Sequence, residues 1–445
     1  MKRLFFYPII ILFSFFLGAD KAAMAVPAQK IFAQKWTTPD TGKIGADSIK
    51  WLQDLAFYRE QMPKTHGNLF HTMTRQQFND TITALEGRIA RLTVNQAKTA
   101  ILRLVAMVND GHTRVRQETL GEHMLPIRLY YFSDGLYVEA AEKDYQNIIG
   151  GKVEKIGNMS EEQVYAAVRN LSSIDGDNEY RRRLMAPALM VNPEILQSIG
   201  SAGTCQSIKI TVLRLNQHIT VSLPAGEFHL PSKHGWSVDG PDWINARTLS
   251  GKPTPLWLQH SDKTYWSRFL PDGKTLYIQY NEVADQKGNE PVVKFFPSLI
   301  KEAEEKKVEQ IVLDLRLNSG GDNGLNRPIW QALIKSERFN QKGKLWVIIG
   351  PKTFSAAMDL VDDLELNTNA IFIGQPTGET PNQWGDPRDI KLPNSGIVIQ
   401  ASTLWWQFQD PRDDRSCKMP DIMVGMSFND YQNGIDPVMQ VIDKR

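Results

Sequence analysis

The residues with the clearest chemical potential follow two apolar segments in the second half of the chain. Segment 311–315 leads into Gly320-Gly321, and segment 347–349 leads through a short turn into Ser355-Ala356. Paired glycines let backbone N–H groups approach a ligand closely, which is the raw material of an oxyanion hole. A serine at the start of a helix can be a nucleophile, because the helix N-terminus favours developing negative charge, or it can simply cap the helix. The residues alone leave both interpretations open.

A candidate general base lies far upstream. His112, within Asp110-Gly111-His112-Thr113, follows a predicted run of helices. With an unperturbed pKa of about 6.5, a histidine suits base catalysis near neutral pH. A structural histidine at a helix end is the alternative.

Several motifs together resemble the S41 (tail-specific, C-terminal-processing) peptidases. They are Asp314-Leu315-Arg316-x-Asn318-x-Gly320-Gly321, Ser355-Ala356-Ala357, Gly374-Gln375-Pro376-Thr377-Gly378, Pro420-Asp421 and Gly434-x-Asp436-Pro437. The resemblance implies that Ser355 attacks a carbonyl. It also implies that the N–H of Ala356 and one from Gly320-Gly321 hold the oxyanion. Asp314, Arg316 and Asn318 are expected to support that turn, and a buried Asp314 would need a polar partner.

The identity of the base follows from which branch of the family the chain resembles. The tail-specific branch uses a lysine, but the matching stretch, residues 377–381, contains none. The branch that resembles the tricorn core protease implies His112 as the base. Gly111 stands where that branch has a serine, and Asp414 lies near the position of its glutamate.

The acid assigned to this relay has close competitors. Asp414 would orient His112 as the acid of a triad does. Asp410 and Asp413 lie nearby, and an acidic surface loop paired with Arg412 and Arg415 is the alternative.

The elements that must position these residues divide the chain into parts. We predict an N-terminal helical domain over 26–120 and a PDZ-like domain over 121–228. An S41-like catalytic domain is predicted over 229–445, including a connector at 229–270. Residues 151–157 resemble a PDZ strand and turn, whereas the insert at 172–203 departs from that fold, and a β-rich spacer is the alternative. From residue 274 onward, continuous apolar strands alternate with helices, which predicts a mostly parallel sheet covered by helices. The expected fold is therefore α/β, with a crotonase-like (ClpP/crotonase) catalytic domain.

The N-terminus predicts export. Lys2-Arg3 precede an apolar run at 4–17, and Ala23-Met24-Ala25 follows it. The run is shorter than the roughly 20 residues that span a bilayer. We predict a signal peptide at 1–25 that is cleaved after Ala25, which leaves a periplasmic or secreted protein off the membrane. An uncleaved anchor is the alternative.

Composition narrows the remaining possibilities. The 445 residues include 51 basic and 50 acidic side chains, a formal net charge of +1, which argues against a nucleic-acid binder. Two cysteines, Cys205 and Cys417, are too few for a usual structural zinc site, and either a disulfide or two free thiols would be compatible with export. No metal or organic cofactor is indicated.

The expected function is that of an exported serine peptidase that hydrolyses peptides or proteins through an acyl-enzyme on Ser355. Two alternatives remain. One is an inactive relative that binds a hydrophobic ligand or a peptide, which the missing lysine and Gly111 favour. The other is a serine hydrolase of non-peptide esters. The sequence leaves the oligomeric state open.

Overall fold

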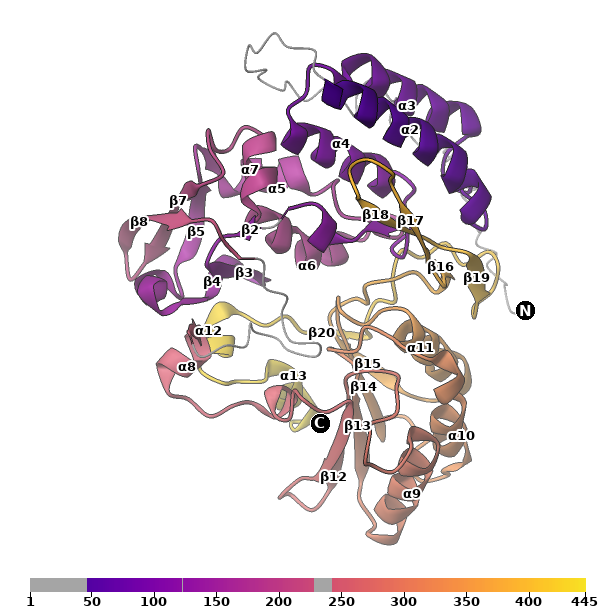
Figure 1. Ribbon diagram of the computed structural model, residues 1–445. Helices are drawn as coiled ribbons and strands as arrows, with labels where there is room; N and C mark the ends of the chain where they lie inside the picture. The colour runs from indigo at the N-terminus through magenta and orange to yellow at the C-terminus, as the bar shows by residue number, and fades with distance from the viewer. Residues whose placement is uncertain (1–45, 122, 228–241) are drawn as a thin grey trace, which may run out of the picture. The chain divides into compact units, whose positions relative to one another are not determined.

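A computed structural model describes residues 46–121, 123–227 and 242–445, which form a mixed α/β structure (Figure 1). The predicted signal peptide at 1–25 and residues 229–241 of the predicted connector lie outside this part of the chain. Within the described ranges, no helix is both long enough and apolar enough to cross a membrane.

Three helices open the described chain: α2 (Ala46–Thr65), α3 (Arg75–Ile89) and α4 (Val94–Ala106). Thr74 and Thr93 start α3 and α4 with capping boxes, in which the threonine and a glutamine three residues later satisfy each other's backbone N–H. Buried residues recur at helical spacing, as in α3 with Phe78, Ile82, Leu85 and Ile89. Helix α4 ends shortly before His112, so its packing fixes where that residue emerges.

An antiparallel sheet of seven strands forms the middle of the described chain. Its path runs β10-β4-β5-β7-β8, with β3 on β4 and β6 on β5. The strands are β3 (Ile127–Phe132), β4 (Gly135–Glu142), β5 (Lys152–Ile156), β6 (Met159–Ser160), β7 (Ser207–Arg214), β8 (Gln217–Pro224) and β10 (Trp243–Asn245). Between β6 and β7 the chain forms α5 (Glu161–Val168), α6 (Glu179–Met190) and α7 (Pro193–Ser198). The helix α6 packs against β3.

A six-stranded sheet carries the apolar segments that lead into Gly320-Gly321 and Ser355. Its order is β11-β12-β13-β14-β15-β20, antiparallel at β11 and parallel from β12 onward. The strands are β11 (Tyr265–Phe269), β12 (Thr275–Tyr280), β13 (Gln310–Asp314), β14 (Leu345–Ile349), β15 (Ile371–Gly374) and β20 (Ile422–Met423). Because parallel strands end at one edge of a sheet, the segments that follow β13, β14 and β15 converge there.

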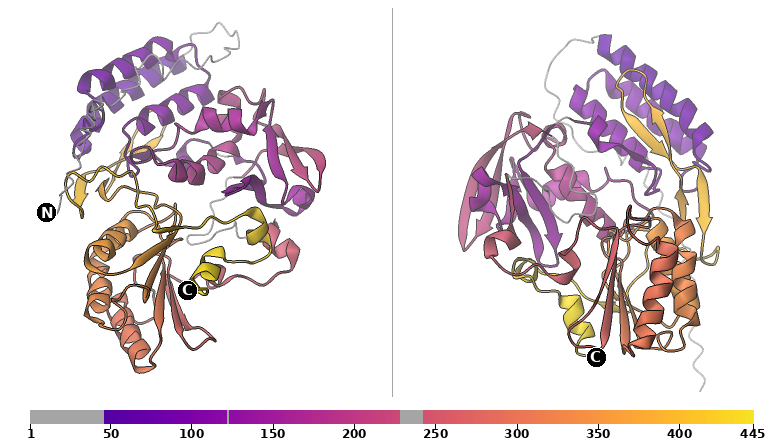
Figure 2. Two further views of the ribbon diagram at one scale, coloured as in Figure 1. Left: turned by 180° about the vertical axis from the view of Figure 1, so that it is seen from behind. Right: turned by 60° about the horizontal axis from the view of Figure 1, so that its bottom comes forward.

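Apolar side chains cover both faces of this sheet, as expected for buried parallel strands. Helices α9 (Val292–Glu305), α10 (Arg327–Lys335) and α11 (Ala356–Asn367) pack on one face (Figure 2). The other face packs against α13 (Pro437–Ile442), through Val438, Met439 and Ile442.

Shorter elements connect these parts. A three-stranded sheet joins β1 (Arg114–Val115), directly after His112, to β18 (Val398–Ala401) and β17 (Arg388–Lys391). Two further pairs are β16 (Asn382–Gly385) with β19 (Leu404–Gln407), and β2 (His123–Met124) with β9 (Gly226–Glu227). The remaining helices are α8 (Ala246–Ser250), α12 (Phe428–Gln432) and the short 3-10 turns at Gln117–Thr119, Lys143–Ile148, Leu256–Leu258 and Asn323–Leu325. The β1–β18 pairing ties the His112 segment to the C-terminal third of the chain.

Candidate active site

Ser355 lies between β14 and α11, at the edge where the parallel strands end. Its backbone has φ 56° and ψ −136°, in a region that non-glycine residues rarely adopt. Its side chain makes no capping hydrogen bond to α11. The hydroxyl instead lies 3.0 Å from His112 Nε2. The structure therefore favours a nucleophile over a helix cap, since strained backbone of this kind concentrates at functional sites.

His112 is held from its backbone. Its N–H donates to Asp110 Oδ1 at 2.8 Å. The other oxygen of Asp110 accepts from Thr113 Oγ1 at 2.6 Å and lies 3.0 Å from His66 Nε2. The His112 ring packs against Phe354, with 4.5 Å between ring centroids. These contacts direct Nε2 toward Ser355, so the two residues predicted as base and nucleophile meet.

The acid beside His112 is Glu379, which the sequence analysis did not select. Its Oε1 lies 3.0 Å from His112 Nδ1, and its side chain is fully buried. Its Oε2 accepts a short hydrogen bond from the backbone N–H of Ser355. Neither His112 Nδ1 nor Glu379 Oε1 makes an aligned hydrogen bond to a described residue. Catalytic hydrogen bonds often tighten only when substrate binds.

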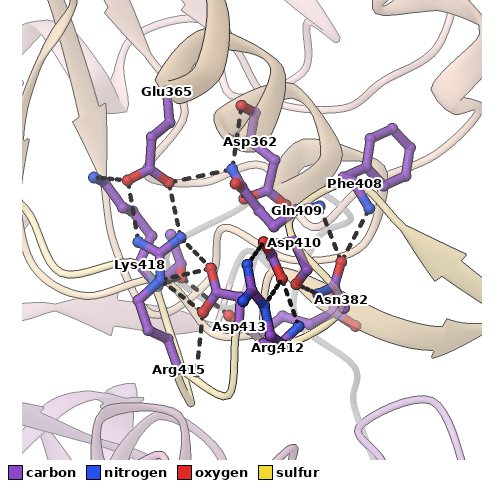
Figure 3. A network of polar contacts seen from close by, with 12 residues as sticks. Asp362, Glu365, Asn382, Phe408, Gln409, Asp410, Arg412, Asp413, Arg415 and Lys418 are labelled. Carbon is purple, nitrogen blue, oxygen red and sulfur yellow. Dashed lines mark hydrogen bonds and ion pairs between the residues drawn. The ribbon is translucent and has the colours of Figure 1, made fainter.

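Asp414 does not occupy the position expected for it. It is exposed, in a loop whose neighbours form their own ion pairs (Figure 3). Arg412 pairs with Asp410 at 2.7 Å, and Arg415 pairs with Asp413 at 2.6 Å. The physical reason is local: closely spaced acids and arginines satisfy one another, and Arg415 also reaches Glu365 at 3.1 Å. The acidic-loop alternative describes this segment.

A signal for Glu379 was present in the sequence. It stands in the 377–381 stretch, after β15, where the resemblance placed a lysine base. At this position the Glu379 carboxylate lies against the His112 ring. The absence of a lysine from this stretch and the presence of His112 are therefore consistent with each other.

The paired glycines approach Ser355 as an oxyanion hole requires, but with distinct roles. The Gly320 N–H donates to Asn318 Oδ1 at 2.9 Å and is therefore occupied. A Cβ on Gly320 would lie 2.5 Å from Ser355 Cβ, so this position needs glycine for close approach. The N–H groups of Gly321 and Ala356 donate to no described residue. These two N–H groups are therefore available to donate to a ligand atom near Ser355.

The motif residues after β13 lock this turn in place. Arg316 bonds Asp314 and reaches Asp436, with 2.9 Å from Nη2 to one oxygen of each carboxylate. Asp314 is fully buried and also accepts from Tyr277 Oη at 2.7 Å. Asp436 in turn accepts from Val438 N–H at the start of α13, at 3.0 Å. Asp314 thus has the partners that its burial demands.

Burial shifts the pKa values of both His112 and Glu379. It lowers the pKa of His112, and Arg114 and Arg181 lower it further against the opposing charges of Asp110 and Asp175. Burial raises the pKa of Glu379 well above its ordinary value. The buried carboxylate is therefore stabilised most when His112 carries a proton.

One cavity lies at the reactive groups. It has a volume of about 370 Å³ and is lined by Ser355, His112, Gly321 and Ala356. Asp359 also lines it and accepts from Asn323 Nδ2 and Gln383 Nε2 at 3.0 and 2.7 Å. Burial raises the pKa of Asp359 to about 7.

A second cavity, of about 390 Å³, has a different charge. Among the described residues, its wall contains five basic side chains and no acidic one: Arg114, Arg128, Arg181, Arg316 and Lys352. Ser319, next to the glycine pair, also lines it. A negatively charged part of a ligand would be favoured there.

The two cysteines and the possible metal ligands are a separate matter from the residues around Ser355. Cys205 and Cys417 are both free thiols, so the structure contains no bond between them. Within the described ranges, no group of three or more His, Cys, Asp and Glu side chains is arranged to hold a metal ion.

Comparisons with known proteins identify the fold. No protein-family model and no curated protein sequence matches the chain. The structure of mature CPAF complexed with lactacystin matches with a TM-score of 0.62 at 14% identity, over 90% of this chain and 98% of that chain. A second crystal structure of mature CPAF matches with a TM-score of 0.58 at 13% identity, over 90% and 97%. The photosystem II D1 C-terminal processing protease matches with a TM-score of 0.39 at 10% identity, over 85% and 93%. At these identities the likeness to CPAF shows the fold alone.

Proposed function

We propose that this protein is a serine peptidase of the S41 type, with Ser355 as nucleophile, His112 as general base and Glu379 as the acid that orients His112. The observation that carries the proposal is the 3.0 Å approach of Ser355 Oγ to His112 Nε2, with Glu379 on the far side of the ring. Nucleophile, base and orienting acid in this order are the working parts of a catalytic triad. The proposed architecture is a crotonase-like catalytic domain with a PDZ-like module, as the motifs imply.

The reaction proceeds by acyl transfer. Ser355 Oγ attacks the scissile carbonyl carbon while its proton passes to His112 Nε2. The oxyanion accepts hydrogen bonds from Gly321 and Ala356 N–H, and the imidazolium is stabilised by Glu379. His112 then protonates the departing amine, which leaves an ester on Ser355. A water, deprotonated by His112, cleaves that ester and restores the free serine.

The proposed substrate is a peptide or protein. One end of that substrate would be held in the second cavity, which is lined by Arg114, Arg128, Arg181, Arg316 and Lys352 and is called the cationic cavity below. A peptide's C-terminal carboxylate would find compensating charge among Arg128, Arg181 and Lys352. We further propose, from the N-terminal sequence, that the chain is exported to the periplasm or secreted.

The test is labelling with a fluorophosphonate probe, which forms a covalent bond with activated serines. The parent protein is compared with Ser355→Ala, His112→Ala and Glu379→Gln, with circular dichroism to show that each is folded. We expect the parent to label, Ser355→Ala not to label, and the other two to label far more slowly. A folded parent that neither labels nor cleaves a mixed peptide library would overturn the proposal in favour of a ligand-binding protein.

A further inference from the structure

One segment from the middle of the chain contacts all three parts of the candidate triad. Residues 174–181 run from the connection after α5 into the first turn of α6, inside the insert at 172–203 that departs from the expected PDZ pattern. They approach the segments that carry His112, Ser355 and Glu379, which come from three distant parts of the sequence. None of these contacts is explained by the reaction chemistry itself.

The first contact holds the His112 segment. Asp175 Oδ1 accepts from the Gly111 N–H at 3.0 Å. The Asn109 amide, oriented with its nitrogen toward the segment, donates to Ile174 O at 3.2 Å and Gly176 O at 2.9 Å. Three hydrogen bonds thus clamp the turn from which His112 emerges.

The same contact explains why glycine occupies position 111. A Cβ at this position would lie 2.5 Å from Asp175 Oδ2 and 2.9 Å from a ring carbon of Phe354. The Asp175 carboxyl and the Phe354 ring therefore fill the space that a side chain would take. The serine implied by the resemblance has no room here, and Asp175 supplies a polar group beside His112 in its place.

The second contact holds the approach to Ser355. Arg181 Nη1 donates to Pro351 O at 3.2 Å, and its guanidinium carbon lies 4.2 Å from the centre of the Phe354 ring. Phe354 precedes Ser355, and its ring also packs against the ring of His112 in a tilted arrangement. Phe354 therefore contacts both Arg181 and His112.

The third contact holds the approach to Glu379. Asn178 Nδ2 donates to Thr377 O at 2.8 Å, two residues before the acid. Asn178 Oδ1 also accepts from Arg181 N–H at 3.0 Å, which caps α6. One asparagine thus joins the start of α6 to the Glu379 segment.

We propose that Asp175, Asn178 and Arg181 hold the three proposed catalytic segments in position relative to one another, with Asp175 as the positioning residue for His112. This rests on the proposed triad. Asp175 takes no part in a chemical step, because its hydrogen-bonded oxygen, Oδ1, contacts the backbone of Gly111 and not the reacting groups.

The charged groups around Asp175 determine which substitution of this residue preserves its contacts. Asp175 faces Glu379, Asp110 and His112, and Arg181 is also close. The Asp175 Oδ2 atom is buried without a hydrogen-bond partner among the described residues. Burial, then the charges of Glu379 and Asp110, raise the pKa of Asp175 well above its ordinary value. A neutral acceptor of the same shape can therefore replace it, so Asp175→Asn should keep the clamp and Asp175→Ala should break it.

The test compares Asp175→Ala, Asp175→Asn and Asp177→Ala in the full chain. Asp177 is the matched control, since it has the same side chain in the same segment but is 86% exposed. We expect Asp175→Ala to lower kcat about 10²-fold with KM within about threefold, because small misplacements of catalytic groups cost that much. Asp175→Asn and Asp177→Ala should stay within about threefold of the parent. An unchanged kcat in folded Asp175→Ala would overturn the inference.

A second readout separates this inference from the proposed function. Histidine-selective NMR follows the His112 ring, assigned with His112→Ala, without any turnover. We expect its titration midpoint to move in Asp175→Ala and not in Asp177→Ala. If the parent is inactive, the proposed function fails, and an unmoved His112 signal then overturns the positioning role as well. If Asp175→Ala does not fold, Arg181→Met tests the same positioning role through the Ser355 contact. A kcat and a His112 titration both unchanged in folded Arg181→Met would overturn it.

Discussion

Glu379 bridges Ser355 and His112: its Oε2 accepts from the N–H of Ser355, while its Oε1 lies 3.0 Å from His112 Nδ1. One buried carboxylate therefore contacts both the proposed base and the backbone of the proposed nucleophile. The three members of the proposed triad are consequently positioned together.

This arrangement predicts a large effect of Glu379→Gln. The glutamine keeps the shape but presents an amide to His112 or to the Ser355 N–H, which favours the wrong imidazole tautomer. We expect kcat for peptide hydrolysis to fall by about 10³- to 10⁴-fold with folding intact. Asp414→Asn is the control, because Asp414 lies in the exposed loop, and it should leave kcat unchanged. The reverse ranking of the two variants would refute the assignment.

The pH dependence of labelling should reflect a histidine with a lowered pKa. His112 acts as a base only when neutral, and burial with Arg114 and Arg181 lowers its pKa below 6.5. Fluorophosphonate labelling should therefore persist on acidification and decline only below pH 6.5.

Removing one of the positive charges should shift the midpoint of this decline upward. In Arg114→Met one positive charge near His112 is removed, which raises the pKa of His112. Labelling should therefore be lost at a higher pH than in the parent. Arg116→Met is the control, since Arg116 pairs with Asp389 at 3.0 Å and is partly exposed. Equal shifts in both variants, or a downward shift in Arg114→Met, would contradict the assignment of His112 as base.

The close approach of Gly320 to Ser355 gives a third prediction. In Gly320→Ala the new Cβ would lie 2.5 Å from Ser355 Cβ on a backbone with φ 103°. The nucleophile must then move relative to the Gly321 and Ala356 donors, and we expect kcat to fall at least about 10²-fold. Gly324→Ala is the control in the same turn, with 3.1 Å to Asp322 Oδ1. Comparable activity of the two variants would remove the steric argument.

The elements around the site were largely predictable because their patterns are local. The apolar segment at 347–349 lies within β14, and the alternation of strands and helices expected from residue 274 onward runs from β12 through α9, β13, α10, β14 and α11 to β15. The apolar segment at 311–315 forms strand β13 only as far as Asp314, whose carboxylate accepts from the Arg316 N–H at 3.0 Å. Continuous apolar runs and capping residues determine such elements without information from distant contacts.

The site was only partly predictable because its parts meet through tertiary contacts. Ser355 and His112 could be proposed from motifs, but Glu379 had to be distinguished from Asp414 by position in space. Burial separates them: Glu379 is fully buried beside His112, whereas Asp414 is exposed. The contacts of Asp175, Asn178 and Arg181 carry no local pattern and could not have been read from the sequence.

The Arg316–Asp436 pair should matter for stability. Both side chains are largely buried, with exposures of 13% and 8%, and Arg316 keeps Asp314 as a second partner when Asp436 is removed. We expect Asp436→Ala to lower the free energy of unfolding by about 1–3 kcal/mol, because Arg316 loses one charged hydrogen-bond partner and retains the other. Asp410→Ala removes an exposed pair with Arg412 and should leave Tm unchanged. Thermal and urea unfolding measure both, and equal effects would contradict the role of this pair.

The cationic cavity gives a prediction about substrate preference. Lys352 lies beside Arg128 and Arg181, and burial followed by these charges lowers its pKa to about 8. A carboxylate held there should bind less well once Lys352 is neutral. We therefore expect the preference for peptides with a free C-terminal carboxylate, over the same peptides amidated, to decline as the pH rises through about 8.

Substitution of that lysine should reproduce the effect at neutral pH. Lys352→Met should raise KM for free-acid peptides by about tenfold, which corresponds to about 1.4 kcal/mol, and leave KM for amidated peptides unchanged. Lys391→Met removes a similar charge from an exposed strand position and should change neither KM. If Lys352→Met raises both values equally, the cavity contributes to general binding or packing and does not recognise the carboxylate. An unchanged preference would place the carboxylate elsewhere, while Ser355, His112 and Glu379 would keep their proposed roles, because none of them touches Lys352 in the described contacts.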